Sequence, residues 1–135
     1  MTDAEYKNIN NIGDSLNNLA NDNEPIIDEV QFEEMRELLE EDFADLLQTF
    51  IDDSKQRITL MQVAQASNDN ANCFEFAHAL KGASATLGAT QLVLLSGELE
   101  LACRKQQVSA QNTLIMQILI ALQKVEVEIN QRLGL

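Results

Sequence analysis

The only histidine of this 135-residue chain lies in the sequence Ala77-His78-Ala79-Leu80-Lys81-Gly82-Ala83-Ser84-Ala85-Thr86-Leu87-Gly88-Ala89. On a helix, at about 100° per residue, the apolar side chains in and before this sequence share one face. That face comprises Cys73, Phe76, Leu80, Ala83 and Leu87. His78 lies almost opposite the apolar face, so we expect its imidazole to meet solvent.

The same apolar periodicity recurs along the chain, and no segment alternates as a strand does. Asp28 is expected to cap a short helix, Gly88 to end the histidine helix, and Thr90 to start the next one. The expected helices are a short one carrying Val30, Phe32, Met35 and Leu38, and longer ones from near Glu40 to near Ser67, about Ala71 to Leu87, about Gln91 to Lys105, and Ser109 or Ala110 to Leu133.

The apolar faces of the four long helices predict an all-α fold, an antiparallel up-down four-helix bundle whose one end is covered by the short helix. The residues expected to be buried include Leu39, Phe43, Leu46, Leu47, Phe50, Ile58, Met61, Leu92, Leu95, Leu99, Cys103, Ile115, Ile118, Leu119, Leu122, Val125 and Ile129.

Residues 1–24 are polar and rich in asparagine, and we separate them from a domain over residues 25–135. Ile9, Ile12, Leu16 and Leu19 nevertheless keep a helical rhythm. One alternative is a marginal helix that lies on the domain or is partly frayed, and the other is a helix that docks another protein. Asparagine and Gly13 weaken a helix, which favours the first alternative.

The composition excludes several classes of function. Nine Lys and Arg against 22 Asp and Glu give a formal net charge of −13, which disfavours nucleic acid and an anionic membrane surface as partners. The first residues lack a signal peptide, and the most apolar stretch, residues 113–125, is too short to span a bilayer. We therefore expect a cytosolic protein in which Cys73 and Cys103 are buried thiols.

The usual catalytic patterns are absent from the sequence. One histidine and two cysteines outside CxxC spacing do not make a metal site, and there is no glycine-rich phosphate loop. Ser84 falls far round the helix from His78, which disfavours a serine triad. We expect no metal and no cofactor.

An exposed imidazole beside an ammonium group remains as the chemistry of the chain. Imidazole has an unperturbed pKa of about 6.5, so its nitrogen is nucleophilic near neutral pH. If His78 accepted a phosphoryl group, Lys81 would offset the added charge. Gly82 and Ala85 would leave room for a donor, at the cost of about 1 kcal/mol of helix propensity for the glycine.

The next helix brings a second set of residues towards His78. Val93, Gly97, Glu100 and Arg104 form its outward stripe. If the two helices pack antiparallel, Glu100 could accept a hydrogen bond from the imidazole. Arg104 is a candidate anion binder or docking contact. Gly97 either allows close helix packing or clears the docking face.

Residues 78–89 resemble the signature H-x-L-K-G-x-S-x-x-L-G of histidine-containing phosphotransfer (HPt) domains, with every fixed position met. The resemblance is specific over about residues 74–105 and implies a monomeric four-helix bundle. It implies that His78 relays a phosphoryl group between aspartates of response-regulator receiver domains, in a bacterial phosphorelay that includes a hybrid sensor histidine kinase. Such domains lack kinase activity of their own, and the receiver brings the Mg²⁺.

The family resemblance also implies roles for individual residues. Lys81 would hold the phosphoryl group and Gly82 would leave room for the receiver. Some members carry a glutamine at the position of Glu100, and some carry a basic residue at the position of Arg104. Two other functions stay open: an acidic helical adaptor that binds a partner helix without chemistry, and a small enzyme that uses His78 as a general base.

Overall fold

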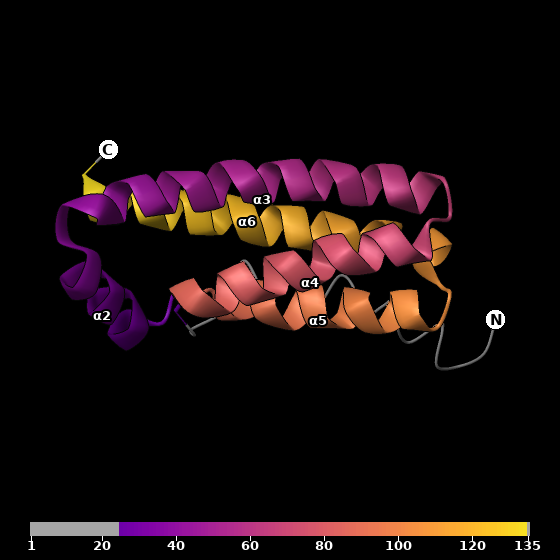
Figure 1. Cartoon of the computed structure of the whole chain (residues 1–135), viewed down its shortest axis with the longest axis horizontal. Coiled ribbons are helices and arrows are strands. Elements are labelled where there is room, and N and C mark those ends of the chain that lie inside the picture. The colour runs from indigo at the N-terminus through magenta and orange to yellow at the C-terminus, as the bar shows by residue number, and fades with distance from the viewer. Residues whose placement is uncertain (1–24, 135) are drawn as a thin grey trace.

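The computed structural model describes residues 25–134 (Figure 1). Its α-helices are α2 (Glu29–Leu39), α3 (Phe43–Ala66), α4 (Asn70–Leu87), α5 (Thr90–Arg104) and α6 (Asn112–Leu133), with 3-10 turns η1 (Glu40–Asp42) and η2 (Val108–Ala110). The predicted four-helix bundle with a short extra helix is confirmed. The apolar stripe predicted at Ile9, Ile12, Leu16 and Leu19 lies outside the described residues.

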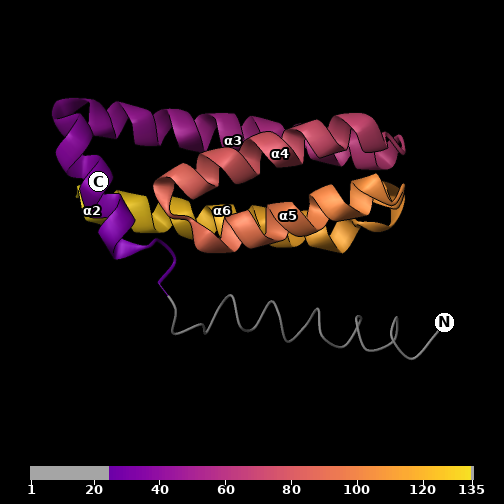
Figure 2. The same ribbon diagram turned by 60° about the horizontal axis from the view of Figure 1, so that its bottom comes forward.

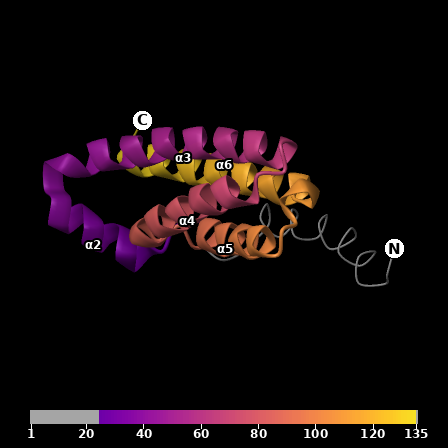
Figure 3. The same ribbon diagram turned by 45° about the vertical axis from the view of Figure 1, so that its right-hand side comes forward.

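The four long helices pack as a closed ring in chain order. Each of α3, α4 and α5 contacts the helix that follows it, and α6 returns to contact α3. Short connections make successive helices antiparallel, as Figure 2 shows for α3, α4 and α5. Helix α2 crosses the end of the bundle at which α4 finishes, which is visible in Figures 1 and 3.

Asp28 and Gly88 act as predicted at the helix ends, and α5 begins at Thr90, as predicted, but without a side-chain cap. Asp28 caps α2 by accepting a 3.0 Å hydrogen bond from the backbone N–H of Gln31. Asp69 caps α4 in the same way, accepting from the Asn72 N–H at 3.1 Å. Gly88 ends α4 with φ of 83°, in the left-handed region where glycine avoids a Cβ clash.

Most of the predicted core is buried, with one clear error. Leu46 is 39 % exposed, whereas the adjacent Leu47 is fully buried. Neighbouring residues point about 100° apart on a helix, and here Leu47 faces the core while Leu46 lies at the edge of the buried face. Leu39, Leu95 and Leu119 are partly buried and pack against the core.

Helix α2 buries one aromatic side chain, Phe32, against the bundle. Phe32 is fully buried and meets the ring of Phe43 edge to face, with centroids 5.0 Å apart. The guanidinium groups of Arg36 and Arg132 lie 5.2 and 4.8 Å from the Phe32 centroid. Arg132 also pairs with Glu29 at 2.5 Å, which ties α6 to the first turn of α2.

The first turn of α2 also seals the end of α4. The Gln31 side-chain amide donates to the carbonyl oxygens of Ala85 and Thr86 at 2.5 and 2.9 Å. The Asp28 N–H donates to the Gly88 carbonyl at 2.9 Å. The Ala85 and Gly88 carbonyls also accept backbone N–H groups, from Gly88 and Thr90, so the bonds from α2 add a second donor to each.

The two cysteines are buried thiols, as predicted. Cys73 on α4 and Cys103 on α5 are 0 % and 2 % exposed, and neither forms a disulfide. Burial, followed by the proximity of Cys103, raises the pKa of Cys73 to about 12. The thiolate needed for reaction is therefore scarce at neutral pH.

Candidate phosphotransfer site

His78 lies on the outer side of α4 with 62 % of its side chain exposed, which confirms the predicted orientation. Ala77 and Leu80, its neighbours on the same helix, are fully buried against the core. The amphipathic pattern of α4 therefore places the imidazole at the surface by fixing the opposite side of the helix.

Glu100 joins the two functional side chains of α4. Its Oε2 lies 3.1 Å from His78 Nδ1, and its Oε1 lies 2.5 Å from Lys81 Nζ. The sequence placed Glu100 on the outward stripe of α5 and predicted that it could approach the imidazole. The approach occurs, but Glu100 is 5 % exposed rather than outward-facing, because α4 packs along α5 and covers it.

The environment of Glu100 favours the carboxylate form. Burial raises the pKa of its carboxyl group, but the hydrogen bonds and charges of Lys81 and His78 outweigh burial and leave the pKa below its usual value. A charged carboxylate can only accept hydrogen bonds, so His78 Nδ1 acts as the donor. In the neutral ring the free lone pair is then on Nε2.

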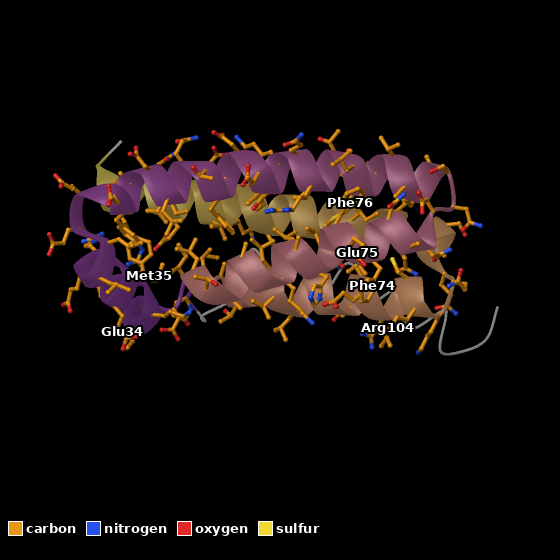
Figure 4. The ribbon with its side chains drawn as sticks, viewed as in Figure 1. Glu34, Met35, Phe74, Glu75, Phe76 and Arg104 are labelled. Carbon is orange, nitrogen blue, oxygen red and sulfur yellow. The ribbon has the colours of Figure 1, made fainter. Side chains whose placement is uncertain are left out.

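An aromatic and a cationic side chain complete the surroundings of His78, and Figure 4 labels both. The Phe74 ring is nearly parallel to the imidazole, at 10°, with centroids 5.9 Å apart. The Arg104 guanidinium lies 5.1 Å from the Phe74 centroid, so Arg104 faces Phe74. Phe74 was not among the predicted site residues, although its position four residues before His78 puts it on the same helical face.

The small residues proposed for clearance differ in their surroundings. A Cβ at Gly82 would meet nothing within 4 Å, so no packing within the domain requires this glycine. A Cβ at Gly97 would lie 3.7 Å from Lys81 Cδ, an ordinary contact, so close packing does not require glycine there either. Ala85 is exposed, and its carbonyl accepts from Gln31.

Three further features of residues 25–134 bear on the chemistry available to the domain. No group of three or more His, Cys, Asp or Glu side chains in this range is arranged to hold a metal ion. None of its helices is long and apolar enough to cross a membrane. A depression of about 130 Å³ where α4 and α5 meet is lined by Lys81, Gly97, Glu100, Leu101 and Arg104.

Comparison with known proteins identifies the family. The sequence profile of the Hpt domain family matches residues 45–128, so the chain belongs to this family. Its members are histidine phosphotransfer intermediates of phosphorelays, and they interact with receiver domains and hybrid kinases. Among curated protein sequences, none matches the chain closely.

Two solved structures are similar to the whole bundle. Histidine-containing phosphotransfer protein B from Pseudomonas aeruginosa PAO1 is 28% identical, with a TM-score of 0.77, over 80% of this chain and 94% of that one. The HPT domain of a sensor hybrid histidine kinase from Shewanella is 24% identical, with a TM-score of 0.67, over 81% and 94%. The second likeness supports the fold alone.

Proposed function

We propose that His78 is the residue that carries the phosphoryl group, and that it relays this group between aspartates of response-regulator receiver domains. The observation that carries the proposal is the arrangement around one exposed imidazole. Glu100 holds Nδ1, Lys81 places an ammonium group beside the ring, and Gly82 leaves the approach open.

The transfer step follows from the hydrogen bond to Glu100. The Nε2 lone pair attacks the phosphorus of an aspartyl phosphate, and the P–O bond breaks as the aspartate leaves as a carboxylate. The proton stays on Nδ1, so the phosphorylated ring carries a positive charge. The Glu100 carboxylate balances that charge, and reversal of the same step returns neutral imidazole as the leaving group.

Once His78 is phosphorylated, Lys81 lies near two negatively charged groups, the Glu100 carboxylate and the phosphoryl group. Its ammonium group has three donors and lies 2.5 Å from Glu100, with 38 % of the side chain exposed. A phosphoryl group on Nε2 adds negative charge near Glu100, and Lys81 screens the two charges from each other. We infer that this balance keeps the phosphorylated form from becoming a stable end product.

The partner receiver supplies what this chain lacks. We propose that it brings the Mg²⁺ and most of the catalytic groups, and that the chain has no kinase activity and binds no cofactor of its own. Gly82, Ala85 and Gly97 would leave the receiver room, and Arg104 would contact it. The phosphoryl donor would be a hybrid sensor histidine kinase.

The proposal also covers the location, oligomeric state and boundaries of the domain. We propose a cytoplasmic monomer whose phosphotransfer domain spans residues 25–135, with residues 1–24 as an extension. The net charge of −13 supports partners other than nucleic acid and membrane.

The test is to incubate the chain with a phosphorylated receiver and Mg²⁺. We expect acid-labile, base-stable label on the wild type and none on His78→Gln. Label on His78→Gln, or no label on the wild type with any receiver of the source organism, would contradict the proposal. An adaptor without chemistry would instead keep all its function in His78→Ala.

A further inference from the structure

The exposed ring of His78 is held by two neighbours, and only one of them bonds to it. We propose that Phe74 is a positioning residue for phosphotransfer: its ring fixes the plane of the imidazole, so that Nε2 points at the incoming phosphorus. This inference rests on the proposed function of His78 and adds a residue to it.

One hydrogen bond is not enough to orient this ring. The torsion that turns an imidazole about its bond to Cβ is broad, and 62 % of the His78 side chain meets solvent. The 3.1 Å contact with Glu100 fixes the direction of Nδ1 but leaves the ring free to tilt about that contact. A flat surface parallel to the ring opposes the tilt.

Phe74 provides that flat surface. The two rings are within 10° of parallel, with centroids 5.9 Å apart, which is an offset stack between residues one helical turn apart. Glu100 therefore sets one axis of the imidazole and Phe74 sets its plane. Together they leave Nε2 as the free, directed nitrogen.

Phe74 is itself held from both sides. It is partly buried and packs against the core, and the Arg104 guanidinium from α5 lies 5.1 Å from its centroid. Arg104, Phe74 and His78 thus form one series of contacts that crosses from α5 to α4. Through this series Arg104 acts on the imidazole via Phe74, as a cation over an aromatic ring.

A fixed ring matters because phosphoryl transfer needs the attacking and leaving atoms in line. The orientation of a reacting group contributes to rate when it is set before the reactants meet. Loss of the Phe74 ring should therefore slow attack by Nε2 with every donor, small molecule or protein. A pure docking role for Phe74 would slow the receiver reaction only.

The chain offers a matched control on the same helix. Phe76 is also partly buried and packs against the core, but it points about 200° away from His78 on the helix. Phe74→Leu and Phe76→Leu remove similar aromatic area from α4. Only the first removes the ring beside the imidazole.

The experiment uses the full chain and two readouts. On the unphosphorylated protein, NMR should show the ring protons of His78 shifted by the nearby aromatic ring; Phe74→Leu should abolish that shift and Phe76→Leu should keep it. With phosphoramidate, whose N–P bond breaks to release ammonia, Phe74→Leu should phosphorylate His78 roughly three- to tenfold more slowly than the wild type. Phe74→Tyr should restore both values.

The outcomes separate this inference from the proposed function. If wild-type His78 takes up phosphoryl groups while Phe74→Leu matches it in both readouts, the positioning role is wrong and the proposed function stands. If Phe76→Leu slows the reaction equally, the effect is structural and the inference also fails. If wild-type His78 is never phosphorylated, both fail. Should Phe74→Leu not fold, Phe74→Met removes the aromatic ring while keeping more of the side-chain volume, and the same loss is expected in both readouts.

Discussion

Gly82→Ala should make the protein more stable and at the same time a poorer phosphotransfer partner. Gly82 lies inside α4 on its exposed side, and an added Cβ would meet nothing within 4 Å. Alanine in place of glycine within a helix gains about 1 kcal/mol, with no clash here to subtract. For a domain of this size that gain raises the Tm by about 4 °C.

The same methyl group lies where the receiver has to approach His78. A methyl that overlaps a packed partner costs roughly 1–3 kcal/mol, so transfer from a phosphorylated receiver should fall about fivefold or more. Phosphoramidate needs little room, so its reaction with His78 should keep the wild-type rate. Thermal unfolding, monitored by circular dichroism, measures the Tm. Time courses of phosphorylation measure the rate with the receiver and the rate with phosphoramidate.

Gly97→Ala is the comparison for stability alone, because Gly97 is itself proposed to leave the receiver room. It gains the same helix propensity, and its methyl meets only Lys81 Cδ at an ordinary 3.7 Å. If Gly82→Ala is no more stable than the wild type, the claim that an added Cβ meets open space at this position is wrong. Unchanged transfer from the receiver would refute its role in clearance, whatever the stability.

Three further predictions concern stability and reactivity. Glu100→Gln should lose about 1 kcal/mol of unfolding free energy near pH 7, because it removes the ion pair with Lys81. The pKa of Glu100 lies below its usual 4.5, so this stabilisation is present above pH 4.5 and is lost as the pH falls through the folded-state pKa. A difference in unfolding free energy between wild type and Glu100→Gln that stays constant down to about pH 2 in urea titrations would contradict this. Gly88→Ala should lose about 1–2 kcal/mol, because φ is 83° and the new Cβ would lie 3.1 Å from that of Asp28; an unchanged Tm would refute the reasoning. Cys73, with a pKa of about 12, should react with iodoacetamide at mildly alkaline pH only after denaturation, and rapid labelling of the folded protein would count against its burial.

The sequence was sufficient for the features that depend on periodicity and local chemistry. The apolar spacing of α4 placed His78 at the surface, because a helix with one buried face has only one solvent face. Asp28 and Gly88 marked helix ends because a cap and a left-handed residue have few substitutes. These rules act within a few residues, so they can be applied before the fold is known.

Features that depend on how two helices meet were harder to predict. Glu100 was expected on an outward stripe, but the depth to which α4 covers α5 decided its burial. The packing of Arg104 on Phe74 depends on side-chain rotamers from two helices, which the helical period does not specify. Leu46 shows the same limit, since the width of an apolar face depends on the neighbouring helix.

The bonds between Gln31 and the end of α4 have a consequence for local opening of the fold. Because the Ala85 and Thr86 carbonyls are bonded to α2, the last turn of the phosphotransfer helix and the first turn of α2 should open together, as one cooperative unit. Amide hydrogen exchange would show it as matched protection of the two turns, and unmatched rates would disprove the coupling.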